Sequence, residues 1–189
     1  MLPLAGRKNI GYIITPDSDR PNLYSLDTLR PWAADNGCYA AGERFDEFRY
    51  LTWLLGLRRW KSTCLFATAP DVVGNAKATW ERSRNWLGLI RVVGFPAALV
   101  AQDGFCQQIV DWEAFDVLFV GGTTEFKMSA AAEMAITLAK LADKPVHVGR
   151  VNSQKRYDHF KKLGVESVDG TFVKFGPDIN IPKLLKWVE

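Results

Sequence analysis

Apolar runs recur along this chain, and segments of helical periodicity separate them. The clearest run, residues 117–120, holds no polar side chain, which is typical of a parallel strand buried on both faces. Residues 128–141 follow with apolar side chains gathered on one helical face. Between the two lies Gly121-Gly122, where a ligand can approach the backbone because no Cβ stands in the way. The unit predicts half of a βαβ motif, whose ligand side lies at the C-terminal strand ends.

The same alternation extends over the chain. Strands are expected at 11–16, 31–34, 63–68, 96–101, 117–120, 144–149, 164–170 and 171–175. Helices are expected at 45–57, 75–90, 106–112, 128–141, 153–163 and 181–188. This pattern predicts an α/β fold, a compact (β/α)8 TIM-like barrel, in a chain shorter than the ~250 residues typical of that fold. The alternative is a doubly wound open parallel sheet. No linker or repeat divides residues 1–189, which are expected to form a single domain.

Composition changes this picture little. With 48% hydrophobic and 24% charged residues, the 189-residue chain reads as an ordinary globular protein, and a net charge of +3 does not diagnose a nucleic-acid binder. Cys38, Cys64 and Cys106 show no CxxC spacing, and His147 and His159 lack metal-ligand spacing, so no metal site is expected. His147 is predicted to be a buried strand residue. Without a signal-peptide pattern or a membrane-length apolar run, a cytoplasmic location is expected.

Chemistry-bearing residues follow the expected strands one after another. They are Asp35, Asp71, Gln102, Gly121, Gly122, Gly149 and Asp169. On a parallel barrel these positions all emerge at one face, from different strands, as catalytic residues do in that fold. Each one alone has a plainer interpretation, because Asp and Gly commonly turn the chain after a strand.

Taken in order, these positions resemble the motifs of the tRNA-guanine transglycosylases. Residues 35–39 (Asp-Asn-Gly-Cys-Tyr) resemble the family's Asp-Ser-Gly-Gly-Phe, and Asp71 stands where that family keeps a second aspartate. Residues 100–104 resemble its Val-Gln-Gly-Gly, and Gly121-Gly122 its Gly-Gly-Leu turn. Gly149 lies in a match to Met-Gly-Val-Gly, and residues 164–169 resemble Gly-Val-Asp-Met-Phe-Asp, which ends in the nucleophilic aspartate. The matches cover most of the chain.

The chain also departs from that family. No cysteine-rich zinc site follows the last motif, the chain is much shorter, and Ala40 replaces the Gln that follows the first motif. The resemblance therefore favours the wider superfamily, which includes the DNA-guanine transglycosylases of bacteria and their phages. These enzymes place 7-deazaguanine bases into DNA, so DNA is favoured over tRNA as the nucleic-acid partner.

The resemblance implies a role for each matching residue. Asp169 would be the nucleophile and Asp35 the general acid/base of a guanine transglycosylase, a glycosyltransferase that works through a covalent aspartyl-sugar intermediate. Paired carboxylates suit such chemistry, because retaining glycosidases use them in the same two roles. The other implied positions bind the base: Asp71, Gln102, Gly121, Gly122, Gly149 and, by stacking, Tyr39. A 7-deazaguanine base would be the co-substrate, with no cofactor, no metal and no membrane partner.

Two alternatives stay open. One is a catalytically silent subunit of the same superfamily, which binds nucleic acid or an active homologue. The other is a small-molecule barrel enzyme that binds phosphate at the turn formed by residues 149–153, next to a helix N-terminus. A protein partner or a homo-oligomer is compatible with each of these readings.

Overall fold

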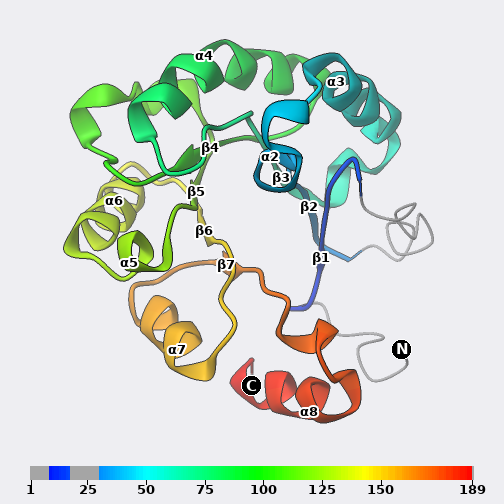
Figure 1. The fold of residues 1–189 in the computed structure, drawn as a ribbon, viewed down its shortest axis with the longest axis vertical. Helices are drawn as coiled ribbons and strands as arrows, with labels where there is room; N and C mark the ends of the chain where they lie inside the picture. The colour runs from blue at the N-terminus through cyan, green and yellow to red at the C-terminus, as the bar shows by residue number, and fades with distance from the viewer. Residues whose placement is uncertain (1–8, 18–29, 189) are drawn as a thin grey trace.

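A computed structural model describes residues 9–17 and 30–188, and its centre is one parallel sheet of seven strands (Figure 1). Every strand pairs with the next one along the chain. The strands are β1 (Tyr12–Ile14), β2 (Trp32–Ala34), β3 (Cys64–Thr68), β4 (Ala97–Ala101), β5 (Val117–Val120), β6 (Val146–Val148) and β7 (Ser167–Val168). A doubly wound sheet reverses its strand order in the middle, so this sequential order supports the barrel prediction.

Helices cover the convex side of the sheet (Figure 1). They are α2 (Cys38–Ala41), α3 (Glu47–Gly56), α4 (Ala76–Val93), α5 (Thr124–Lys127), α6 (Ala130–Leu141), α7 (Gln154–Lys162) and α8 (Pro177–Trp187), with five 3-10 turns: η2 (Gly42–Arg44), η3 (Arg58–Thr63), η4 (Gln107–Ile109), η5 (Trp112–Ala114) and η6 (Phe172–Lys174). The expected eighth strand at 171–175 is η6, and the expected helix at 106–112 is a pair of 3-10 turns. No helix in the described part of the chain is long and apolar enough to cross a membrane.

Side-chain caps explain where three of these helices begin. Asn75, Ser129 and Ser153 each accept a hydrogen bond from the backbone N–H three residues later, which satisfies a donor that the first helical turn leaves free. The caps at Asn75 and Ser153 stand at the first residues of two helices expected from the sequence, 75–90 and 153–163.

Both faces of the curled sheet are apolar. The outer face packs against the helices through side chains such as Leu99 and Leu118, while a second cluster fills the concave inner face. That inner cluster consists of Ala33, Phe66, Ala98, Val100, Val117 and Phe119. All four residues of β5 are buried, as expected for a strand covered on both sides.

The barrel is incomplete between its first and last strands. Within the described residues, β7 pairs only with β6 and β1 only with β2, so no ladder closes the ring. The helix α8 lies beside this opening in Figure 1, and a cavity of about 870 Å³ occupies it. Residues 9–13, residues 165–170 and the C-terminal end of α8 line the cavity.

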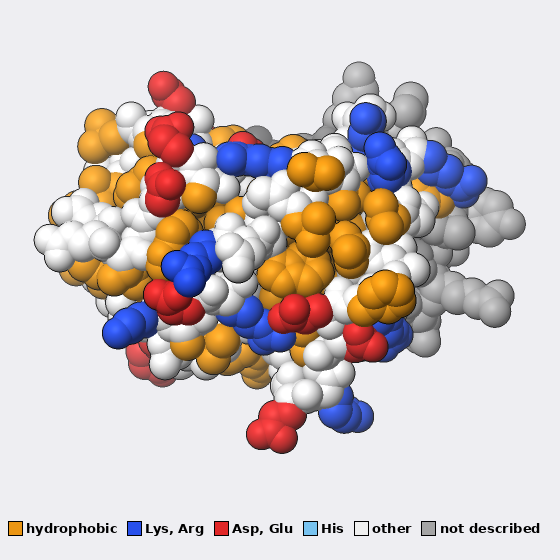
Figure 2. All heavy atoms as spheres, turned by 90° about the horizontal axis from the view of Figure 1, so that it is seen from above, with side chains coloured by type: hydrophobic (Ala, Val, Ile, Leu, Met, Phe, Trp, Pro, Cys, Tyr) orange, Lys and Arg blue, Asp and Glu red, His pale blue; other side chains and the backbone are white. Residues whose placement is uncertain are grey.

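One outer face stays apolar. Figure 2 views the molecule from the side of α3 and α4 and shows hydrophobic side chains gathered there. The most exposed are Phe48 on α3 and Val92 on α4, at 78% and 80%, with Leu55 and Leu89 also exposed. Helices α3 and α4 therefore present apolar area that the fold itself does not bury.

Candidate functional site

The predicted site residues continue the inner face of the barrel. Side chains alternate between the two faces of a strand, so a residue two positions beyond an inward side chain also points inward. Asp35 lies two residues after Ala33, Gln102 two after Val100, and Gly121 two after Phe119. All the predicted strand-end residues lie at the C-terminal edge of the sheet, the edge that carries catalysis in parallel barrels.

Asp35 is a partly buried carboxyl directly after β2. Its backbone N–H donates to the Ile14 carbonyl at 2.8 Å, which extends the β1–β2 ladder, and its Oδ1 accepts the Gly37 N–H at 2.7 Å. Burial raises the pKa of Asp35 to about 6, against the lowering effect of the Gly37 N–H, and the charges of Asp71 and Asp169 raise it further. Asp35 therefore stays protonated to a higher pH than an ordinary aspartate. The effect of both other carboxylates shows that the three aspartates share one electrostatic environment.

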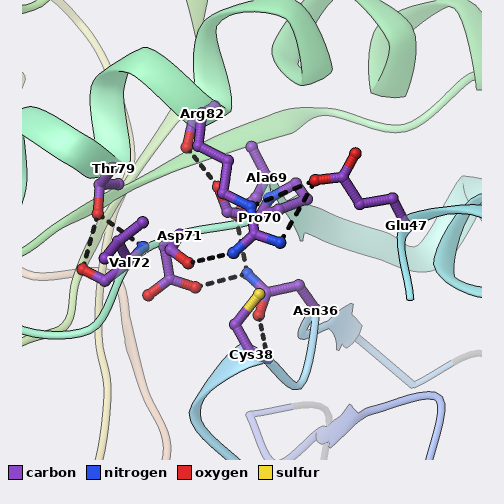
Figure 3. A network of polar contacts seen from close by, with 10 residues as sticks. Asn36, Cys38, Glu47, Ala69, Pro70, Asp71, Val72, Thr79 and Arg82 are labelled. Carbon is purple, nitrogen blue, oxygen red and sulfur yellow. Dashed lines mark hydrogen bonds and ion pairs between the residues drawn. The ribbon is translucent and has the colours of Figure 1, made fainter. Parts of the chain in front are cut away.

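Asp71 is the centre of a buried polar network, part of which Figure 3 draws. Asn36 Nδ2 donates to Asp71 Oδ1 at 2.9 Å, and Gln102 Nε2 donates to Oδ2 at 2.5 Å. Gln102 Oε1 in turn accepts the Gly74 N–H at 2.9 Å, so both ends of this carboxamide are engaged. Burial raises the pKa of Asp71, and the two amide donors offset part of that rise. The network fixes both side chains before any ligand arrives.

The loop that carries Asp71 has a further support. Arg82, on α4, donates from Nη1 to the Asp71 carbonyl at 3.1 Å and forms an ion pair with Glu47 on α3 (Figure 3). This arginine ties two helices to the turn after β3.

Asp169 directly follows β7 and has partners of its own. Its Oδ2 lies 3.1 Å from His147 Nε2, and its Oδ1 accepts the Arg150 N–H at 3.1 Å. Burial favours the protonated acid, but the hydrogen bond from His147, the Arg150 N–H and the charge of Lys127 outweigh it and lower the pKa of Asp169. Asp169 is therefore ionised over the whole range in which Asp35 titrates.

Lys127 lies close to this aspartate. Its side chain is 3% exposed, and Nζ donates to the Gly149 carbonyl at 2.8 Å. Burial lowers the pKa of Lys127 to about 8, and the charge of Arg150 lowers it too, while Asp169 raises it. The ammonium group keeps its charge at neutral pH and supports the negative charge of Asp169.

The three glycines of the site make room for the protein's own atoms. A Cβ on Gly121 would lie 2.8 Å from Val100, and one on Gly149 would lie 2.9 Å from the Phe119 ring. Gly122 has φ +71°, and its Cβ would lie 2.6 Å from Asp103 Oδ2. Close packing thus explains why glycine stands at each position, and it accounts for these residues without a ligand.

Tyr39 is 68% exposed, on the short helix α2. The guanidinium of Arg150 lies 4.8 Å from the centre of its ring and also donates to the Gly122 carbonyl. This contact bridges the loops after β2, β5 and β6. Arg150 thus links Tyr39, Gly122 and Asp169, while Asp35 acts on the other two aspartates through its charge.

The cavity touches only part of this cluster. Asp169, with His147, lines it, but Asp35, Asp71 and Gln102 are not among its described lining residues. Asp169 is thus common to the aspartate cluster and to the opening between β7 and β1. Among the described residues, no three His, Cys, Asp or Glu side chains are placed to hold a metal ion together.

Sequence reasoning missed the residues that support the aspartates. Asn36 and Arg82 hold Asp71 and its loop, while His147 and Lys127 stabilise the charge of Asp169. One signal was present for His147: it lies two residues before Gly149 on the same strand face.

Comparisons with known proteins address the fold. No protein-family model and no curated protein matches the chain. Among solved structures, a ligand-free TrpA mutant of tryptophan synthase from M. tuberculosis aligns with 90% of this chain and 65% of its own, at 14% identity and a TM-score of 0.55. The tryptophan synthase complex of Pyrococcus furiosus aligns with 91% of this chain and 72% of its own, at 15% identity and a TM-score of 0.56.

A mutant alpha-subunit from P. furiosus gives similar values, 14% identity and a TM-score of 0.53, over 87% of this chain and 69% of its own. The chain thus spans about two thirds of the length of these structures. None of the three is a transglycosylase, so the resemblance stated from the motifs stays a prediction. At such identities the likeness establishes architecture alone: the protein has an α/β fold of the TIM-barrel type, with seven parallel strands in a curled, open barrel.

Proposed function

We propose that this protein is a guanine transglycosylase that exchanges guanine in nucleic acid, with DNA favoured, for a 7-deazaguanine base. The observation that carries the proposal is the opposite shift of two neighbouring carboxyl groups. The pKa of Asp35 is raised to about 6, whereas the pKa of Asp169 is lowered. Carboxyl groups whose pKa values are driven apart supply an acid and a nucleophile at the same pH.

The reaction uses these two groups in turn. The Asp169 carboxylate attacks C1′ of the nucleotide, a C1′–oxygen bond forms, and the bond between C1′ and the guanine nitrogen breaks. Asp35 gives its proton to the departing guanine and then accepts one from the incoming deazaguanine, whose nitrogen displaces Asp169 from C1′. Two displacements retain the configuration of the sugar, as in the retaining glycosidases.

Recognition of the base is proposed for the remaining predicted residues. Asp71 and Gln102 are hydrogen-bonded to each other, so guanine would use the second lone pair of each Asp71 oxygen or exchange places with the Gln102 amide. The exposed ring of Tyr39 would stack on the base, and the peptide groups of Gly121, Gly122 and Gly149 would border it. Guanine in a duplex has to be extruded, which costs a few kcal/mol and favours a single-stranded site.

A catalytically silent subunit is the second candidate, and three observations favour it. Asp71 and Gln102 satisfy each other, and the space beside each site glycine is already filled by the chain itself. The apolar face over α3 and α4 offers area for a protein partner or a second copy. Such a subunit would bind nucleic acid or an active homologue without exchanging the base.

The phosphate-binding alternative has weaker support. The backbone N–H groups of Arg150 and Val151 already donate to Asp169, at 3.1 and 2.6 Å, and Ser153 caps α7. The turn therefore has few free donors for a phosphate.

The test is exchange of labelled guanine into DNA and into tRNA, offered separately. We expect exchange with DNA and a protein–DNA adduct on denaturing gels. Asp169→Asn keeps the shape of the side chain but removes the nucleophile, so both signals should disappear while the thermal melt stays cooperative. Asp158→Asn, an exposed change on α7, is the matched control. Undiminished exchange in folded Asp169→Asn would refute the assignment, and no exchange in the unaltered protein would favour the silent subunit.

A further inference from the structure

His147 is a buried imidazole that the proposed reaction does not use. It lies in the middle of β6 on the inner face, 4% exposed, with ring centres of Phe119 and Phe66 at 4.8 and 4.9 Å. Two aromatic rings thus fix the plane of the imidazole. Both of its nitrogens have partners on the neighbouring strand: Nδ1 lies 2.8 Å from Ser167 Oγ and Nε2 lies 3.1 Å from Asp169 Oδ2.

The chemistry of the three groups fixes where the protons lie. An ionised carboxylate only accepts hydrogen bonds, so His147 Nε2 must carry a proton toward Asp169. In a neutral imidazole the other nitrogen is then an acceptor, and the Ser167 hydroxyl donates to it. This arrangement satisfies every polar atom without a cation between the two phenylalanine rings.

We propose that Ser167 and His147 form a relay that orients Asp169 and stabilises its negative charge, with His147 as a positioning residue and Ser167 setting its tautomer. Asp169 Oδ2 is held by His147 and Oδ1 by the Arg150 N–H, so the carboxylate plane is defined from both sides. The other charged groups that act on Asp169 are Lys127, which supports the anion, and Asp35, which opposes it.

The relay has a kinetic consequence that rests on the proposed function. Asp169 loses its charge when it bonds to C1′ and regains it when the incoming base displaces it. A donor held against Oδ2 stabilises that returning charge, so its loss should slow turnover rather than weaken binding. We expect His147→Leu to lower kcat on the order of 10–100-fold, the effect typical of residues that orient a reacting group, with KM nearly unchanged.

His147→Gln is the conservative rescue, because its amide N–H can take the place of Nε2–H; it should recover most of the lost kcat. His159→Leu is the matched control on α7, since that histidine contacts Glu133 and not the site. The acid limb of the pH–rate profile should move to higher pH in His147→Leu and stay in place in the control. If His147 had a purely structural role, His147→Leu and His147→Gln would lower the activity equally and would leave the pH–rate profile in place.

A direct measurement separates this proposal from the proposed function. The sequence contains two histidines, so 15N-labelled imidazole spectra hold two sets of signals. Ser167→Ala should change the His147 nitrogen shifts and leave those of His159 unchanged. Titration of 13C-labelled aspartate carboxyls should show that His147→Leu raises the pKa of Asp169. His147→Gln should raise it by less.

These spectra test the relay even if the protein exchanges guanine in neither DNA nor tRNA. In that case the transglycosylase proposal fails, and the relay is judged by the spectra alone. If His147→Leu does not fold, Ser167→Ala still reports on the His147 nitrogens, and the Asp169 titration can be followed in His147→Gln, where a smaller rise of the Asp169 pKa is expected. Unchanged His147 shifts in Ser167→Ala, or an unchanged Asp169 titration without His147, would overturn the inference.

Discussion

Asp35→Asn is expected to stabilise the folded protein at neutral pH while removing its general acid. The folded state raises the pKa of Asp35 from 3.8 to about 6, so it binds the proton more tightly than the unfolded chain does. Stability therefore falls as pH rises from about 4 to about 6 and stays reduced above that range. At 1.36 kcal/mol per pKa unit the cost at pH 7 is about 3 kcal/mol, and residual exposure of Asp35 favours the lower side of that figure.

Asparagine removes this cost because it carries no charge, and its amide oxygen can still accept the Gly37 N–H. We expect a gain of about 2–3 kcal/mol at pH 7, or a Tm about 4–12 °C higher in a chain of this size. At pH 4, where the native carboxyl is already protonated, the gain should nearly vanish.

The assay is guanidinium unfolding of both proteins at pH 4 and pH 7, with Asp158→Asn as an exposed control. Equal stabilisation at both pH values would show that the gain does not come from an ionised, buried Asp35. A loss of stability at pH 7 would refute the reasoning outright. Base exchange should fall sharply in the same variant, so stability and activity would move in opposite directions.

The remaining predictions concern pH, glycine packing and the buried amide. The rate of base exchange should decline above about pH 6 as Asp35 loses its proton, and on the acid side it should fall only when Asp169 becomes protonated. A rate that rises through pH 7 would contradict this assignment. Gly122→Ala should lower the free energy of unfolding by on the order of 1–3 kcal/mol, because φ is positive and the added Cβ would meet two neighbours under 3.0 Å. The loss should be clearly larger than in Gly104→Ala, where φ is also positive but no atom lies within 4 Å. Equal chemical-denaturation midpoints for the two variants would show that crowding contributes nothing. Asn36→Ala should lower the free energy of unfolding by about 1–3 kcal/mol, because the buried Asp71 carboxylate loses one hydrogen-bond donor. The loss should be smaller at low pH, where Asp71 is protonated, and urea unfolding at two pH values checks both statements.

The sequence was sufficient for the architecture because strand burial leaves a direct trace. Short apolar runs such as 117–120 and 97–101 are typical of strands covered on both sides, and a cap residue such as Asn75 marks a helix start. The prediction was wrong at 171–175, whose β-branched and aromatic side chains suit a strand. There the Thr171 N–H donates to the Asn152 side chain at 2.7 Å, and the chain turns back on itself in η6.

The site was predictable in position but not in its supporting contacts. Strand ends locate Asp35, Asp71 and Asp169, because all parallel strands end at the same edge. The partners of Asp71 and Asp169 depend on strand register and side-chain reach, which spacing along the chain does not encode. His147 and Ser167 meet because Val148 pairs with Val168 and His147 with Ser167, a register that becomes known only once the strands are placed.

The open side of the barrel has a consequence for how firmly the proposed nucleophile is held. β7 pairs through two residues, against four between β4 and β5, and its other edge faces the cavity. Local opening there breaks few hydrogen bonds, so we expect the amide protons of β7 to exchange sooner than those of β4 and β5. What restrains β7 from outside is the aromatic contact of Trp187 with Phe172, at 4.5 Å, and with Tyr157, at 6.3 Å. Helix α8 follows Asp169 closely in sequence and packs through Trp187 against η6 and α7. We therefore expect that loosening α8 would free the nucleophile before the barrel as a whole unfolds.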